Sequence, residues 1–220
     1  METALSEDAL LRAWETAQRL VPVARSLALL SAASGESIEA LAALPLGERD
    51  RRLVALRAEL YGTEVRGVAN CAFCEEELEL GFDAGLLPGA RDVNPGVRQP
   101  TTFDLVAAAG AGNAAAAYDV LVRRWLADAA DADAVGTLEA AILDADPGID
   151  TELAVPCPAC GETTLVDFDA GAYAWTEIES NVQRLFATVA ALARHYGWAE
   201  REILAMSAQR REAYLALAFA

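Results

Sequence analysis

The chain reads Cys71-Ala-Phe-Cys74 at one place and Cys157-Pro-Ala-Cys160 at another, and these two short stretches decide the fold. Two cysteine pairs of this spacing, each at the turn of a β-hairpin, bring four thiolates to a tetrahedral Zn²⁺ ion. The sequence therefore predicts a zinc ribbon with Cys71, Cys74, Cys157 and Cys160 as metal ligands. The predicted cofactor is a structural Zn²⁺ ion.

Apolar and polar residues alternate around both pairs, which is typical of short strands with one buried face. The alternating positions are Leu78, Leu80 and Phe82 after the first pair, Ile149, Thr151, Leu153 and Val155 before the second, and Val166 and Phe168 after it. Gly161 follows the second pair and suits a turn that other residues resist. Glu75 stands at the equivalent place after the first pair, so we expect that turn to be less regular.

The two pairs are separated by 82 residues, from Cys74 to Cys157. A compact zinc ribbon has about 15 to 20 residues at this place. A ribbon divided by a helical insertion explains the separation, because the entropy of loop closure grows only logarithmically with loop length. The predicted fold is mainly α with a small β zinc ribbon, an α+β arrangement of helices around a split four-cysteine ribbon that carries a helical insertion.

Composition and patterning divide the chain into four parts. They are an N-terminal helical region (1–62), the two halves of the ribbon (63–82 and 149–169), an acidic helical insert (83–148), and a C-terminal part with one long and two short helices (170–220).

Capping residues and apolar spacing place the helices within these parts. Ser6 and Ser37 are placed as N-caps in the first region, where three or four short helices fit, the last ending at Gly62. Thr101 and Asn113 are placed as caps in the insert, where a further helix is expected from Thr137 to Asp144. Residues 81–100 are rich in glycine and proline and predict an irregular connector.

An apolar seam marks the long C-terminal helix, which we expect to run from about Ala170 to His195 and to stop at Gly197. The seam consists of Ile178, Val182, Leu185, Val189, Leu192 and Tyr196. It suits packing on the protein's own domain better than a coiled coil with a partner. Two shorter helices are expected after it.

Other interpretations of the cysteines stay open at this level. A dithiol redox pair normally lies between a strand and a helix, and neither cysteine pair is expected there. A catalytic zinc keeps one coordination position for water, whereas four thiolates would fill all the positions. Incidental buried cysteines are the remaining alternative. The single histidine, His195, the acidic run Glu75–Glu77 and the glycines of Gly110–Gly112 lack the surroundings of a catalytic or phosphate-binding motif.

The net charge is −17 with 34 acidic and 17 basic residues, which argues against a nucleic-acid partner. Residues 75–156 hold 16 acidic and four basic residues, so most of the excess charge belongs to the insert. We expect the insert to face water or a basic partner surface. No stretch approaches the roughly 20 apolar residues of a membrane span, and the N-terminus has no signal-peptide pattern, so a cytoplasmic location is expected.

Several segments, spread over nearly the whole chain, carry a resemblance to a known family. They are Leu46–Asp50 with Leu53, Leu56-Arg57 and Tyr61-Gly62; the two cysteine pairs; Pro100–Thr102 with Asp104-Leu105; Asp146-Pro147; and Leu192–Leu204 with Arg210-Arg211 and Tyr214-Leu215. In these the chain resembles the zinc-ribbon-containing proteins, similar to T4-type baseplate hub assembly chaperones, that are encoded beside contractile phage-tail-like injection systems. It departs from them at Glu75, where similar proteins tend to have glycine.

The resemblance implies a non-enzymatic assembly factor, a chaperone whose partner is a baseplate, hub or tail component. One alternative is a permanent, zinc-stapled structural subunit of the baseplate or tail. Another is a zinc-ribbon nucleic-acid or transcription module. The nucleic-acid alternative is disfavoured by charge. The basic residue nearest to the cysteines is Arg66, whereas four acidic residues follow the first pair: Glu75, Glu76, Glu77 and Glu79.

Overall fold

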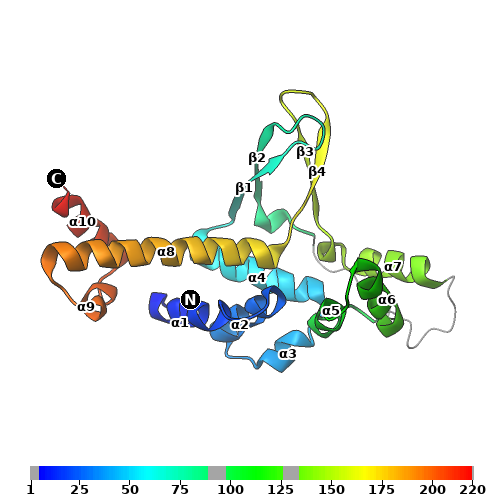
Figure 1. Ribbon diagram of the computed structural model, residues 1–220, viewed down its shortest axis with the longest axis horizontal. Helices are drawn as coiled ribbons and strands as arrows, with labels where there is room; N and C mark the ends of the chain where they lie inside the picture. Colours follow the sequence, from blue (N-terminus) through cyan, green and yellow to red (C-terminus); the bar gives the residue numbers. More distant parts are fainter. Residues whose placement is uncertain (1–4, 89–97, 126–133, 220) are drawn as a thin grey trace.

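The computed structural model describes residues 5–88, 98–125 and 134–219 (Figure 1). The long helix α8 runs along much of the molecule, with helices α1, α2 and α4 beside it, and α3 packs against α2. Two β-hairpins project from the other side of α8, the insert helices α5 to α7 lie near one of its ends, and α9 and α10 lie near the other. The prediction of a mainly helical fold with two hairpins that carry clustered cysteines is confirmed.

Local capping explains where the N-terminal helices begin and end. The Ser6 hydroxyl accepts a hydrogen bond from the Ala9 N–H, and the Ser37 hydroxyl accepts one from Ala40, each at 3.2 Å. Gly35 ends a helix in the left-handed conformation, with φ of 75°. The bounds are Glu7–Ala17 for α1, Pro22–Ser34 for α2, Ile38–Ala42 for α3 and Leu46–Tyr61 for α4.

Helix α8 (Ala170–Tyr196) supplies one side of the main hydrophobic core. Its seam residues Ile178 and Val182 are buried with Trp14, Leu29 and Leu53 of the N-terminal helices. A fully buried leucine contributes about 1.5 to 3 kcal/mol relative to an exposed one, so this contact is a principal source of stability. The expectation that the seam packs on the protein's own helices is therefore confirmed.

The ribbon consists of two antiparallel hairpins. Their strands are β1 (Glu64–Asn70) with β2 (Glu77–Asp83) and β3 (Glu152–Pro156) with β4 (Thr163–Asp167). Burial alternates along each strand, and Val65 and Leu78 lie on the buried face of the first hairpin. The rings of Phe82 and Phe168 meet edge to face, 5.1 Å apart, and join the two hairpins at their base.

Two details of the strand predictions are wrong. Ile149 lies in the short 3₁₀ helix η3 (Pro147–Ile149), not in a strand, because the Asp146 carboxylate accepts the Gly148 N–H and turns the chain. Thr151 lies between η3 and β3. The expected irregular connector also begins too early, because β2 extends to Asp83 and the 3₁₀ helix η1 (Ala84–Leu86) follows it. Its part over 89–97 lies outside the described residues.

The insert helices are α5 (Thr102–Ala109), α6 (Ala114–Trp125) and α7 (Ala134–Ala145). Asn113 caps α6 as predicted, by accepting the Ala116 N–H at 2.9 Å. Helix α7 begins three residues earlier than the predicted Thr137. The alanine-rich run that Asn113 caps extends to Ala130 in the sequence, and its part after Trp125 lies outside the described residues.

A buried carboxylate holds the first part of the insert together. Asp104 is fully buried and accepts hydrogen bonds from Arg98 at 3.0 Å and Arg124 at 2.7 Å. It also accepts the Thr101 N–H at 2.8 Å, which completes the predicted cap of α5. Residues from the connector, α5 and α6 therefore meet on one side chain.

The ribbon is attached to the helices by two contacts at its base. Arg57 of α4 is buried, pairs with Glu177 of α8 at 2.6 Å, and donates to the Glu64 carbonyl at the start of β1. The Tyr173 hydroxyl on α8 accepts the Arg66 N–H at 3.1 Å. These bonds fix the direction in which the hairpins leave the helical body.

The C-terminal helices α9 (Glu200–Leu204) and α10 (Ala208–Ala218) fold back on the end of α8. Gly197 ends α8 in the left-handed conformation, as predicted. Trp198 then stacks on Tyr196 with the ring centroids 4.4 Å apart, and Tyr214 packs against both rings. Among the described residues, no helix combines the length and the apolar character that crossing a bilayer requires.

Candidate metal centre

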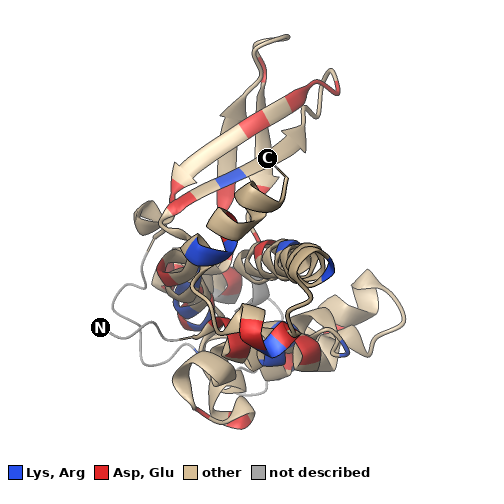
Figure 2. Ribbon diagram, turned by 90° about the vertical axis from the view of Figure 1, so that its left-hand side faces the viewer, with Lys and Arg blue, Asp and Glu red and all other residues tan. Residues whose placement is uncertain are grey.

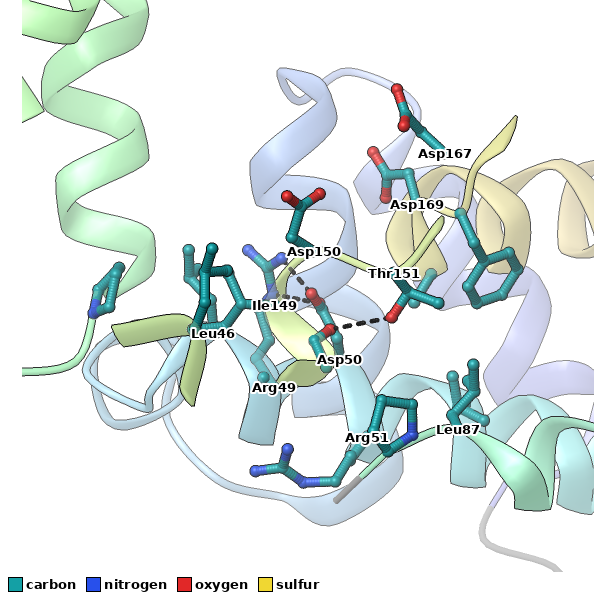
Figure 3. A pocket seen from close by; sticks show the side chains of 18 of the residues that line it. Leu46, Arg49, Asp50, Arg51, Leu87, Ile149, Asp150, Thr151, Asp167 and Asp169 are labelled. Atoms are coloured by element: carbon teal, nitrogen blue, oxygen red, sulfur yellow. Dashed lines mark hydrogen bonds and ion pairs between the residues drawn. The ribbon is translucent and has the colours of Figure 1, made fainter. Parts of the chain in front are cut away.

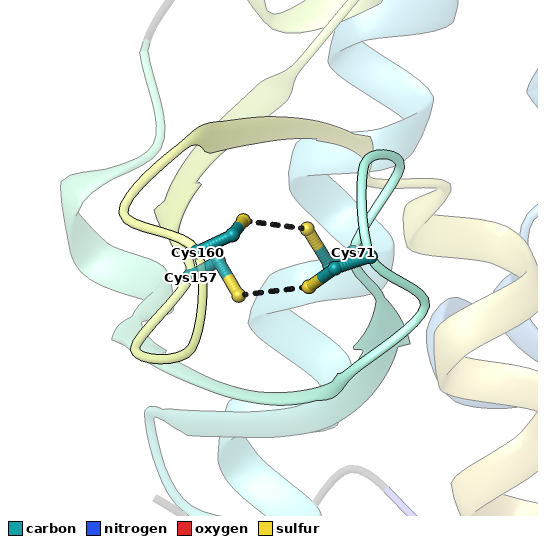
Figure 4. Close-up of side chains that lie close together, drawn as sticks. Cys71, Cys157 and Cys160 are labelled. Atoms are coloured by element: carbon teal, nitrogen blue, oxygen red, sulfur yellow. Dashed lines mark hydrogen bonds between the residues drawn. The ribbon is translucent and has the colours of Figure 1, made fainter.

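The turns of the two hairpins place all four cysteines in one cluster (Figure 4). Their Sγ atoms lie within 4.8 Å of one another. Two sulfur contacts cross between the hairpins, at 3.7 Å from Cys71 to Cys160 and 3.6 Å from Cys74 to Cys157. The sequence prediction that these residues come together despite their separation is confirmed.

Both cysteine turns have the same backbone hydrogen bonds. The Cys71 N–H donates to the Glu76 carbonyl, and the Glu75 N–H donates to the Cys71 carbonyl. In the second turn, Cys157 and Gly161 make the equivalent bonds at the same distances, 2.8 and 3.0 Å. The expectation of a less regular first turn is therefore wrong.

Glu75 achieves this regularity by adopting a backbone conformation that glycine normally supplies. Its φ is 62°, close to the 79° of Gly161, and among the described residues it is the one non-glycine with positive φ. A side chain in this region costs about 1 kcal/mol. The backbone hydrogen bonds of the turn therefore hold Glu75 in a conformation that is unfavourable for a residue with a side chain.

The cluster has the dimensions of a tetrahedral metal site. Four sulfurs at about 2.3 Å from a central Zn²⁺ ion are about 3.8 Å from one another, and the two contacts between the hairpins, at 3.6 and 3.7 Å, approach this value. A disulfide needs about 2.05 Å, so the cysteines are free thiols. The four residues would hold the ion as thiolates.

Donors around the sulfurs favour the ionised form of one cysteine. The Phe73 N–H points at the Cys71 Sγ, 3.5 Å away, and lowers the pKa of Cys71 to about 6. The Glu76 N–H also favours the Cys74 thiolate, but desolvation and the neighbouring thiols outweigh it and raise the pKa of Cys74 to about 12. Cys74 therefore favours the neutral thiol without a metal, and a bound cation would be needed to hold all four cysteines as thiolates.

The burial of the cluster suits a structural ion. Cys71 and Cys157 are buried and pack with Leu78 and Val155, whereas Cys74 and Cys160 face solvent. The Thr164 hydroxyl lies beside the cluster, accepts the Ala72 N–H at 3.1 Å and contacts the Cys71 sulfur at 3.7 Å. Each pair lies in a hairpin turn, not at the start of a helix as in dithiol oxidoreductases.

The other groups considered in the sequence lie apart from the cysteines. His195 is exposed in the last turn of α8 and contacts the Tyr196 ring. Glu75, Glu76 and Glu77 are exposed beside the first pair, and Gly110–Gly112 joins α5 to α6. None of them joins the cysteine cluster.

Sequence reasoning missed a second feature, a cavity of about 880 Å³ between α4, the insert helices and the base of the ribbon (Figure 3). Beside it, the buried carboxylate of Asp146 binds Arg51 through both oxygens, at 2.8 and 3.1 Å. A Cβ atom added to Gly47 would lie 2.1 Å from this carboxylate. Gly47 and Asp146 are 99 residues apart in the chain, so no local sequence pattern indicated this contact.

No protein-family model, curated protein or solved structure matches this chain. The evidence for a metal site is therefore the arrangement of the four cysteines in this structure.

Proposed function

We propose that the protein is a cytoplasmic, non-enzymatic assembly factor that holds a baseplate, hub or tail component of a contractile phage-tail-like injection system before that component is incorporated. In this proposal a structural Zn²⁺ ion bound by Cys71, Cys74, Cys157 and Cys160 keeps the two hairpins together. The partner is a protein, and the helices and the ribbon supply the surface that it binds.

The observation that carries the proposal is the convergence of three segments of the resemblance. The Leu46 N–H donates to the Pro100 carbonyl at 2.9 Å, and Pro45 pairs with Thr101. Gly47 packs against Asp146. Segments that are far apart in the chain therefore lie together in one structural unit, and this supports the proposal that they serve one role.

Charge argues against the nucleic-acid alternative. The four ribbon strands contain a single basic residue, Arg66, and that residue pairs with Glu64 at 2.8 Å. Figure 2 shows acidic residues along the strands and near their tips. A ribbon that binds phosphates needs several free cations, so a protein partner is the better interpretation.

Mass spectrometry of purified, fully assembled particles tests the assembly role. An assembly factor is absent from the particles, and deletion of its gene prevents their formation. A stoichiometric amount in the particles would contradict the proposal and favour the permanent structural subunit. Normal particles in the deletion strain would contradict both.

Metal analysis tests the cofactor independently. Protein purified without chelator should contain one zinc ion per chain, and the Cys71→Ser/Cys157→Ser variant should contain none. A wild-type zinc content far below one per chain would refute the structural ion.

A further inference from the structure

The cavity beside α4 has the size and the lining of a binding site. Its volume of about 880 Å³ falls within the roughly 300 to 1,000 Å³ of protein ligand pockets. Apolar side chains from α4, α7 and the segment after η1 form much of its wall, among them Val54, Leu87, Ile142 and Leu143. Leu143 is 41% exposed although it belongs to this apolar wall.

Carboxylates line one side of the cavity, next to this apolar wall. Figure 3 shows Asp150, Asp167 and Asp169 along one side of the cavity, and all three are exposed. Asp169 accepts the Ala172 N–H at the start of α8. Within the described part of the chain, neither Asp150 nor Asp167 takes part in an ion pair.

The two arginines on the α4 side of the cavity do not offset these charges, because both are already paired. Arg49 pairs with Asp50 at 2.7 Å, and Arg51 pairs with Asp146 at 2.8 Å. The surface offered to a partner is thus apolar at the centre and negative at the edge. Phosphate-containing ligands would be repelled by such an edge.

We propose that this cavity docks a cationic amphipathic segment of a protein partner. Apolar side chains of the segment fill the space between α4 and α7, and flanking arginines or lysines pair with Asp150 and Asp167. Recognition of this kind places an amphipathic helix in a groove and reads its apolar anchors. The inference rests on the proposed function for the partner's role as a client, whereas the cavity can be tested without the client.

The probe is a fluorescein-labelled helical peptide of about 14 residues, four turns, with leucines on one face and arginines beside them. We expect saturable binding by fluorescence anisotropy, weakened by added salt. The Ala55→Trp variant places an indole from the exposed side of α4 into the cavity and should weaken binding at least about tenfold. The Asp150→Asn/Asp167→Asn variant should weaken it about fivefold, as expected for two partly exposed ion pairs.

Matched controls separate the cavity from general charge attraction. The Glu179→Gln/Glu212→Gln variant loses the same charge from exposed sites on α8 and α10 and should bind the peptide like the wild type. A peptide with glutamates in place of the arginines should not bind. Equal binding of both peptides, no binding of the arginine peptide, or unchanged binding by Ala55→Trp would overturn the proposal.

The outcomes also distinguish the cavity from the assembly role. Peptide binding that depends on Ala55 and Asp150, together with normal particles in the deletion strain, supports the cavity and refutes the assembly role. Failed particle assembly in that strain without peptide binding leaves the assembly role standing and refutes the cavity. Thermal melting of each variant confirms that a loss of binding is not a loss of folding.

Discussion

Replacing Gly47 by alanine should destabilise the protein, although alanine is the better helix former. Gly47 is the second residue of α4, where alanine alone would add up to about 1 kcal/mol of stability. The added Cβ would lie 2.1 Å from Asp146 Oδ2 and 2.4 Å from its Cγ. The carboxylate must therefore move or α4 must shift.

The size of the effect follows from what holds Asp146 in place. Its side chain is 3% exposed, binds Arg51 at 2.8 Å and accepts the Gly148 N–H at 3.2 Å. Overpacking of a buried site costs about 1 to 3 kcal/mol. With a central overpacking cost of about 2 kcal/mol and a helix-propensity gain of up to about 1 kcal/mol, we expect Gly47→Ala to lower the free energy of unfolding by about 1 to 2 kcal/mol.

Urea denaturation of a double-mutant cycle tests this mechanism. In an Asp146→Ala background the obstacle is gone, so Gly47→Ala should become neutral or stabilising, with a coupling of about 2 kcal/mol between the two sites. Gly112→Ala is the matched control, because nothing lies within 4 Å of its added Cβ. The same effect of Gly47→Ala in both backgrounds, or a stabilising effect in the wild type, would refute the reasoning.

Three further predictions concern single groups. Burial raises the pKa of Asp104, but hydrogen bonds from Arg98, Arg124 and the Thr101 N–H outweigh it and hold that pKa well below its usual range. Asp104 therefore stabilises the fold above the unfolded pKa of about 3.9, and this contribution is lost as pH falls through the lower folded pKa. Asp104→Asn should lower the free energy of unfolding at pH 7 by about 2 kcal/mol, because its two arginine partners are about half exposed. Urea titrations at several pH values should show that the variant has lost this acid-sensitive part of the stability. The same pH dependence in the variant and the wild type would contradict this role of Asp104. Glu75→Gly should raise the melting temperature by relieving about 1 kcal/mol of backbone strain. Gly161→Ala should lower the melting temperature, because it introduces a similar strain. A shift of the melting temperature in the same direction in both variants would contradict the conformational argument. Chelation should lower the melting temperature of the wild type but not that of Cys157→Ser, measured by circular dichroism with and without added zinc, because only an intact ligand set gains folding free energy from the metal.

Local signals in the sequence predicted the elements well. Ser6, Ser37 and Asn113 cap helices as expected, because a cap depends on hydrogen bonds within three residues of the chain. Gly197 ends α8 for a similarly local reason. The cysteine pairs were recognisable because the spacing within each pair is itself a local feature.

Contacts between distant residues were the part that sequence patterns missed. Asp146 lies next to Gly47, and Asp104 accepts hydrogen bonds from Arg98 and Arg124. In the sequence, each of these charged residues resembles an ordinary helix cap or a surface charge. The Glu75 conformation was also mispredicted, since the hydrogen bonds of the whole turn outweigh the local preference of one residue. The cavity arises from the same long-range packing.

The division of the ribbon between two distant hairpins has a topological consequence. Each hairpin supplies two of the four sulfurs, and the chain from Cys74 to Cys157 contains 82 further residues. With a metal bound, the sulfur–metal–sulfur linkage closes this stretch into a ring. A single backbone cut between α6 and α7 would then leave two fragments joined through the ion, and removal of the ion would take away that link between them.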